Sequence, residues 1–234
     1  MKAILIVGIA LIVSASSINC PSRGLSPDTR KAMLDKHNEL RSQNALGRAR
    51  DGSTGRNAPR ARNMYKLQWD CNLERIAQNW ANRCQFQHSR SNLGENLYAS
   101  GPPTNNDGPA RDASASWWDE LREIGIGRYS ANFRFSNSVS SRGVGHYTQM
   151  AWARTTKLGC GHAKCSRMNI VVCNYSPAGN YVGQQIYIVG NPCQKDSDCT
   201  TYRNSRCSAK EGLCYIAGGR AEELHIGFNQ TLVV

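Results

Sequence analysis

The sequence predicts an α+β fold in which helices cover an antiparallel sheet and disulfide bonds staple the chain. Helical periodicity is concentrated in the first half of the chain, whereas runs rich in Ile, Val and Tyr lie in the second half. Ten cysteines follow an N-terminal export signal. These three observations are typical of a secreted, disulfide-rich α+β protein.

Residues 1–17 have the pattern of a cleaved signal peptide. Lys2 supplies a positive start, residues 3–13 form an apolar run, and small residues fill positions 14–17. The run is too short to cross a bilayer, and no later segment is apolar for long enough. We therefore expect a secreted, extracellular protein that is not an integral membrane protein.

The cysteines predict five disulfides and no free thiol, because an even number in a secreted chain implies a disulfide framework. Zinc ligation is the rival interpretation, but the sequence has no Cys-x-x-Cys pair. The sequence alone does not determine the pairing. The cysteines are Cys20, Cys71, Cys84, Cys160, Cys165, Cys173, Cys193, Cys199, Cys207 and Cys214.

One domain is expected over residues 18–190, and it opens with a helix over residues 26–43. Ser26 is a plausible cap, and Pro27 and Asp28 suit the first turn. Along the helix, Met33, His37 and Leu40 fall on one face. A polar, glycine-dotted loop should follow to about residue 62.

Two further helices are expected. Asp70 starts the clearest one, since apolar residues then recur at helical spacing as far as Cys84. The other covers residues 112–123 and should bury Trp117, Trp118 and Leu121.

The second half of the domain predicts strands. Residues 169–175 and 184–189 are rich in Ile, Val and Tyr, and residues 158–162 could pair with them.

Beyond the domain, the composition changes twice. Residues 191–215 form a short polar segment with four cysteines, which two local disulfides should hold because it is too small to bury a core. Residues 216–234 are interpreted as a loosely ordered tail, in which the sequon at Asn229 could be glycosylated. The sequon at Asn174 lies in a predicted strand, so we expect it to stay unmodified.

The protein is strongly basic. Its formal net charge is +12, and removing Lys2 with the signal subtracts one charge and leaves +11. Such a charge favours anionic partners such as glycosaminoglycans, acidic membrane surfaces or acidic proteins, while export argues against nucleic acid. Many of the arginines lie in the glycine-dotted stretch up to residue 62, which is interpreted as a solvated loop in preference to a dedicated anion site.

Four segments carry a resemblance to a known family. They are residues 37–41 (His-Asn-Glu-Leu-Arg), 93–97 (Leu-Gly-Glu-Asn-Leu), 145–152 (Gly-His-Tyr-Thr-Gln-Met-Ala-Trp) and 173–181 (Cys-Asn-Tyr-Ser-Pro-Ala-Gly-Asn-Tyr). In this order they resemble the signature motifs of the CAP superfamily of cysteine-rich secretory, antigen 5 and pathogenesis-related proteins. The tryptophan pair and the cysteine-rich segment resemble the venom-allergen-like, activation-associated secreted proteins of nematodes.

The resemblance implies an α-β-α sandwich with a central cleft where His88, Glu95, Glu120 and His146 meet. Two neutral imidazoles can bind Zn²⁺ or another divalent metal weakly, with His88 and His146 as ligands. The two carboxylates would orient the imidazoles. Taken singly, each residue also has a purely structural interpretation: a helix brace, a turn contact or a surface charge.

The expected function is binding rather than catalysis. The sequence has no Gly-x-Ser-x-Gly elbow and no His-Glu-x-x-His helix, although metal-dependent hydrolysis stays a weaker alternative. The family suggests a host-directed modulator of immune or haemostatic responses that binds a host cell-surface or plasma protein. The alternative is binding or export of a sterol or fatty acid. Tyr129, Phe133 and Phe135 match an aromatic loop for sterol capture, or else anchor that loop to the core.

Overall fold

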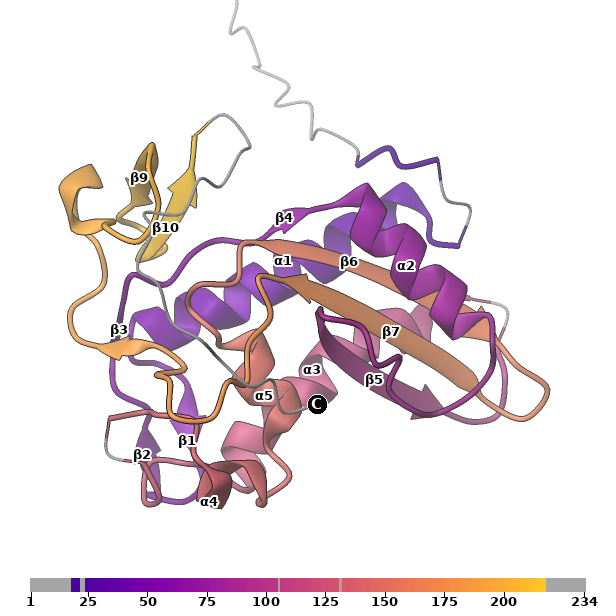
Figure 1. The fold of residues 1–234 in the computed structure, drawn as a ribbon, viewed down its shortest axis with the longest axis horizontal. Helices are drawn as coiled ribbons and strands as arrows, with labels where there is room; N and C mark the ends of the chain where they lie inside the picture. The colour runs from indigo at the N-terminus through magenta and orange to yellow at the C-terminus, as the bar shows by residue number, and fades with distance from the viewer. Residues whose placement is uncertain (1–17, 22–23, 105, 131, 218–234) are drawn as a thin grey trace, which may run out of the picture.

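The computed structural model describes residues 18–21, 24–104, 106–130 and 132–217. The predicted signal peptide over residues 1–17 and the sequon at Asn229 lie outside these residues. The described chain forms three layers, with one helix on one face of a four-stranded sheet and the other long helices on the second face (Figure 1). The predicted α+β class and the α-β-α sandwich are confirmed.

The central sheet has the strand order β4-β6-β7-β5, with bounds β4 (Gln68–Trp69), β6 (Lys157–Lys164), β7 (Asn169–Ser176) and β5 (Gly94–Ser100). Antiparallel pairing joins β6 to β7 and β7 to β5, and β4 adds in parallel at the edge. Seven of the eight residues of β7 are buried, because helices cover both faces of the sheet. The predicted strands over 158–162 and 169–175 are confirmed.

Helix α2 (Cys71–Ala81) alone covers one face of the sheet. The Asp70 carboxylate caps it by accepting from the amides of Asn72 and Leu73. Two glycines of β6 let the helix approach closely: a Cβ on Gly159 or Gly161 would lie 2.2 or 2.4 Å from its backbone. The helix predicted to start at Asp70 is confirmed.

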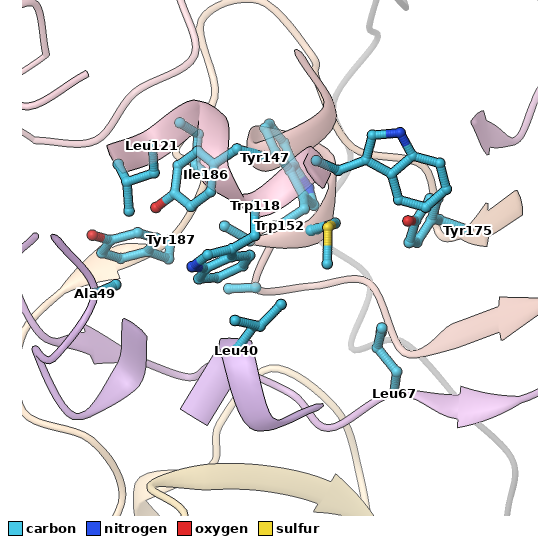
Figure 2. Packing of buried hydrophobic residues seen from close by; sticks show 14 of the residues in the cluster. Leu40, Ala49, Leu67, Trp118, Leu121, Tyr147, Trp152, Tyr175, Ile186 and Tyr187 are labelled. Carbon is cyan, nitrogen blue, oxygen red and sulfur yellow. The ribbon is translucent and has the colours of Figure 1, made fainter. Parts of the chain in front are cut away.

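The other face is covered by α1 (Pro27–Ala45), α3 (Gly108–Glu123) and α5 (Gly145–Met150). The Ser26 hydroxyl caps α1, as predicted. Helix α3 begins four residues before the predicted start at residue 112, because Pro109 occupies its first turn. Figure 2 shows Leu40 of α1 facing Trp118 of α3 in the core between these helices.

The structure adds one strand to those predicted from the sequence and corrects another. Residues 94–100 were not expected to form a strand, yet β5 lies at the edge of the sheet. The strand expected over residues 184–189 shrinks to β8 (Ile188–Val189), which pairs with β3 (Ala61–Arg62) outside the central sheet. The preceding residues instead exchange backbone hydrogen bonds with the loop at 133–135. The side chains of Ile186 and Tyr187 are buried in the core.

The loop before residue 62 is also more ordered than expected. It contains a hairpin of β1 (Arg50–Asp51) and β2 (Arg56–Asn57). The Asp51 carboxylate is buried and accepts from the amides of Ser53, Ile126 and Gly127 at 2.9, 3.2 and 2.7 Å. This one side chain therefore fixes the hairpin to the loop that follows α3.

All ten cysteines form disulfides, which confirms the prediction of five bridges and no free thiol. The pairs are Cys20–Cys71, Cys84–Cys165, Cys160–Cys173, Cys193–Cys207 and Cys199–Cys214. The last two lie within the cysteine-rich segment, as expected. That segment also forms η1 (Asp196–Asp198) and a hairpin of β9 (Ser205–Ser208) and β10 (Leu213–Ile216), which ends just beyond the predicted boundary at 215.

The cysteine-rich segment docks on the domain through Tyr65. The Tyr65 hydroxyl accepts from the amides of Thr201 and Tyr202, both at 3.2 Å. The carbonyl of the same tyrosine accepts from Arg41, whose buried guanidinium also binds four carbonyls between residues 150 and 155. Arg41 of α1 therefore connects that helix to the end of α5 and to Tyr65, on which the cysteine-rich segment docks. No helix among the described residues is long and apolar enough to span a bilayer.

Candidate functional site

A cleft of about 270 Å³ opens where the start of β5 meets α3 and α5. The structure brings together in its wall all four residues that the resemblance grouped: His88, Glu95, Glu120 and His146. Glu95 comes from β5, Glu120 from the last turn of α3, and His146 from the first turn of α5. His88 lies in the loop between α2 and β5.

The first pair joins His88 and Glu95. The Nδ1 atom of His88 lies 2.9 Å from Oε1 of Glu95, and the same oxygen accepts from the amide of Ser89 at 2.9 Å. The Glu95 side chain is 2% exposed, whereas the imidazole is 39% exposed. Burial acts to raise the pKa of Glu95, but the hydrogen bonds from His88 and Ser89 outweigh it and lower the pKa below its usual value. Glu95 is therefore an ionised acceptor at neutral pH.

The second pair, His146 of α5 and Glu120 of α3, repeats this arrangement. The Nδ1 atom of His146 lies 2.5 Å from Oε1 of Glu120, and the other oxygen of Glu120 accepts from the amide of Tyr147 at 2.9 Å. The indole of Trp117 stacks on the imidazole with ring centroids 6.0 Å apart. Carboxylate and indole together determine the orientation of the His146 ring.

The carboxylates also determine the tautomers. An ionised carboxylate only accepts hydrogen bonds, so Nδ1 of each neutral imidazole must carry the proton. The Nε2 atoms of His88 and His146 then keep their lone pairs, which is the state that binds a metal. The cleft can thus present two preoriented nitrogen donors.

A buried chain of hydrogen bonds supports the cleft, and the sequence analysis did not foresee it. The Asn96 amide donates to the carbonyl of His146 and to the Tyr175 hydroxyl, at 3.1 and 3.2 Å. That hydroxyl lies 3.0 Å from Nε2 of His37, whose Nδ1 donates to the carbonyl of Met33. Burial lowers the pKa of His37 to about 4, so the ring is neutral and accepts from Tyr175.

Each polar link of this chain belongs to one of the signature segments at 37–41, 93–97 and 173–181. The sequence feature that could have indicated this hydrogen-bond chain is the presence of Asn, Tyr and His at positions within apolar patterns. Gln149 and Asn180, two further polar residues of the cleft wall, come from the remaining signature segment and from the end of 173–181.

The predicted aromatic loop is mostly packed into the core. Phe133 and Phe135 are 1% and 2% exposed, and Phe133 contacts Tyr187 with ring centroids 4.8 Å apart. Phe135 also reaches the cleft wall. Tyr129 is 42% exposed, with the Arg142 guanidinium 3.5 Å from its ring centroid. In this conformation the two phenylalanines anchor the loop, which is the alternative interpretation given above.

Asn174 is fully buried in β7, consistent with the expectation that this sequon stays unmodified. Within the described part of the chain, one group of three residues has its ligand atoms close enough for a shared metal, namely Cys193, Cys199 and Cys207. These sulfurs are all in disulfides, so they are not thiolate ligands.

Comparisons with known proteins agree with the motifs. The model of the cysteine-rich secretory protein (CAP) family matches residues 34–175. The Ancylostoma secreted protein of Ancylostoma caninum is 39% identical over 208 residues, 86% of this chain and 48% of that protein. The chain thus spans about half the length of that relative. Venom allergen 3 of Solenopsis invicta is 35% identical over 70% of this chain and 74% of its own length.

A solved structure is similar along most of the chain. The crystal structure of NaASP2 with Zn²⁺ is 43% identical, has a TM-score of 0.75, and covers 84% of this chain and 100% of its own. The resemblance seen in the sequence is thereby confirmed, as is the secreted, extracellular location that the export signal and the disulfides indicated. This chain belongs to the CAP family of cysteine-rich secretory proteins.

Proposed function

We propose that this protein is an extracellular binding protein whose cleft holds a divalent cation such as Zn²⁺ through Nε2 of His88 and His146. The observation that carries the proposal is the pairing of each imidazole, through Nδ1, with its own carboxylate. Metal-binding histidines are oriented in this way, because a carboxylate on Nδ1 fixes the tautomer and makes Nε2 a better donor.

Two protein ligands make a weak site. Apart from the disulfide-bonded cysteines, no trio of His, Cys, Asp or Glu in the described chain has ligand atoms close enough for a shared ion. Water would complete the coordination shell, so binding should be modest and reversible. The crystal structure of NaASP2 with Zn²⁺ supports a divalent metal in a related protein.

Binding, rather than catalysis, is the role proposed for this cleft. Acyl transfer by a side chain needs a hydroxyl or thiol hydrogen-bonded to a base. Across the described residues, the Nδ1 atoms of His88 and His146 pair with carboxylates, and no hydroxyl or thiol pairs with either imidazole. A metal held by two histidines would lower the pKa of a bound water, which makes metal-dependent hydrolysis the alternative to test.

The binding is proposed to be directed at a host protein of the immune or haemostatic system. Support comes from the similarity to a secreted protein of Ancylostoma caninum and to a venom allergen. A disulfide-stapled domain that presents fixed loops is a suitable scaffold for such contacts. Binding of a sterol or fatty acid is the competing role.

One experiment separates these roles. The secreted protein is incubated with host plasma and cell lysate, and the bound proteins and extracted lipids are identified by mass spectrometry. The proposal expects one dominant protein partner, retained by a Phe133→Leu variant that keeps the core filled. Sterol or fatty acid without a protein partner would overturn it in favour of a lipid carrier. Turnover of an ester or peptide library by the wild type, lost in His88→Ala, would instead establish the hydrolase.

A further inference from the structure

Exposed arginines gather at one end of the molecule, where β1, β2 and β3 lie together at the left of Figure 1. We call Arg48, Arg50, Arg60 and Arg62 the basic face, and all four side chains are exposed. The only acidic residue between positions 46 and 62 is Asp51, which is 1% exposed. The exposed charge of this segment is therefore entirely positive.

The backbone places these arginines side by side. Arg48 and Arg50 are exposed on either side of Ala49, which is buried and whose carbonyl accepts from the amide of Ala58, just before β1 pairs with β2. The Cγ atom of Arg60 lies 2.8 Å from the point where a Cβ on Gly47 would be. Arg60 thus sits against the residue before Arg48, and Arg62 follows on the same side of its strand.

No salt bridge recorded between described residues involves any arginine of the basic face. The nearby Asp51 carboxylate does not neutralise them, because its oxygens accept from Ser53, Thr54 and the amides of Ile126 and Gly127. By contrast, Arg122, Lys66 and Arg206 each pair with a carboxylate on the same molecule. The basic face is thus left to anions from outside.

The face is also preorganised. The buried Asp51 carboxylate ties the β1–β2 hairpin to the segment after α3, and β3 is tied to β8 by backbone pairing. A surface whose backbone is already fixed loses less entropy on binding than a mobile loop would. This order argues against the interpretation of the segment as a merely solvated loop.

We propose that the basic face binds a sulfated glycosaminoglycan. Guanidinium groups match the planar, multidentate recognition of sulfate and carboxylate oxygens, and the protein acts outside the cell, where such polymers are available. None of the large apolar side chains that are exposed in the described chain belongs to residues 46–62, as a predominantly apolar protein interface would require. The face is separate from the metal-binding cleft, so this inference goes beyond the proposed function.

An anionic membrane is the other macromolecule to test. The exposed apolar residues Ile188 and Val189 border Arg62 across the β3–β8 pair. They belong to β8, which runs beside Arg60 and Arg62, whereas Arg48 and Arg50 lie on the segment that leads into β1. The polymer is therefore the better match to the centre of the face.

The test compares two triple variants of the full secreted protein on immobilised heparin. Arg48→Gln, Arg50→Gln and Arg60→Gln remove three charges from the basic face. Arg75→Gln, Arg83→Gln and Arg167→Gln remove three exposed charges elsewhere and serve as the matched control. We expect the first triple to bind roughly ten-fold to a hundred-fold more weakly than the wild type. The control should stay within about two-fold, and thermal unfolding checks that both variants are folded.

Further arms identify the ligand. Heparin should compete with binding, whereas fully desulfated heparin and hyaluronan should compete much less, because the sulfate groups carry the charge that the arginines recognise. Equal weakening of the two triples would overturn the proposal, since it would leave only net charge as the cause. Binding to phosphatidylserine vesicles without binding to heparin would overturn it in favour of a membrane. Neither result would affect the proposed metal site.

Discussion

At the scale of single residues, the carboxylates of the cleft decide what its histidines can do. Glu95 and Glu120 each occupy one imidazole through Nδ1 and also accept from a backbone amide, which anchors the carboxylate itself. The histidines are half-exposed while their acceptors are largely buried. The cleft therefore combines fixed geometry with access for an ion from solvent.

Replacing Glu120 tests this orientation directly. Glu120→Gln keeps the size of the side chain but removes the charge that fixes the His146 tautomer, so Zn²⁺ affinity should fall about 10-fold to 100-fold. Asp119→Asn is the matched control, because it removes one carboxylate from the same helix at a site that pairs with Arg122. Isothermal titration of both variants with Zn²⁺ makes the comparison. Equal affinity in Glu120→Gln and the wild type would contradict the orienting role.

A second residue-scale prediction concerns acid and His37. Its folded-state pKa is about 4, against 6.5 for an unburied histidine. As pH falls below 6.5 the unfolded chain takes up the proton first, so stability is lost until pH passes the folded-state pKa. Between pH 7.5 and pH 5 this should remove about 2 kcal/mol of unfolding free energy.

Urea unfolding of the disulfide-intact protein at both pH values checks this expectation. His37→Gln should lose that part of the pH dependence, even if it is less stable at every pH. His162→Gln, which alters a histidine outside the buried hydrogen-bond chain, should keep it. An unchanged pH dependence in His37→Gln would mean that the buried ring is not the group that titrates.

At the scale of elements, the central parts of the fold could be predicted and its edges could not. Helix α2 and strand β7 are determined by periodicity and β-branched content, which act locally. Strand β5 escaped prediction because Gly94, Glu95 and Asn96 disfavour strands, and its position depends on pairing with β7. The run at 184–189 has the composition of a strand, but the side chains of Ile186 and Tyr187 are buried in the core and the run does not join the central sheet.

The candidate site, too, could be predicted only in part. Its residue types could be named from the signature segments, but the convergence of His88 and His146 depends on long-range packing of α3 and α5 against β5. The support from Asn96 and Tyr175 to His37 could not be predicted, since it joins three segments distant in sequence.

The Asp51 carboxylate yields a prediction for the β1–β2 hairpin. Asp51→Ala would leave the amides of Ser53, Ile126 and Gly127 without their acceptor. We expect a loss of about 3 kcal/mol of stability, because unsatisfied buried donors are costly. Hydrogen exchange should accelerate at Ile126 and Gly127 and stay slow in β7. Asp35→Ala, a change at an exposed carboxylate of α1, is the control. Unchanged protection at both amides would show that the carboxylate does not hold this junction.

At the scale of the whole molecule, the five disulfides distribute between the layers. Two bridges lie near the ends of α2: Cys20–Cys71 at its first residue and Cys84–Cys165 just beyond its last. Cys160–Cys173 joins β6 to β7, and two bridges hold the cysteine-rich segment. Only the last two have both cysteines in the cysteine-rich segment. No disulfide joins this segment to the sandwich, and it is attached through contacts such as those of Tyr65, so it should open before the sandwich unfolds.

Removing one of these bridges tests that order of opening. The double change Cys193→Ser and Cys207→Ser should cost the cysteine-rich segment about 3 kcal/mol, because the bridge closes a loop of this length. Limited proteolysis with mass spectrometry should then find cleavage between residues 193 and 216 while the sandwich stays intact. Cleavage spread through α1 and the central sheet would contradict this order.

The central claim is that His88 and His146 share one metal, and calorimetric titration of the metal-free protein with Zn²⁺ tests it most directly. The account predicts one weakly bound equivalent in the wild type, and a loss of affinity of more than about ten-fold in both His88→Ala and His146→Ala. His162→Ala should bind like the wild type. If both cleft variants bind Zn²⁺ as the wild type does, the metal lies elsewhere and the cleft is not its site.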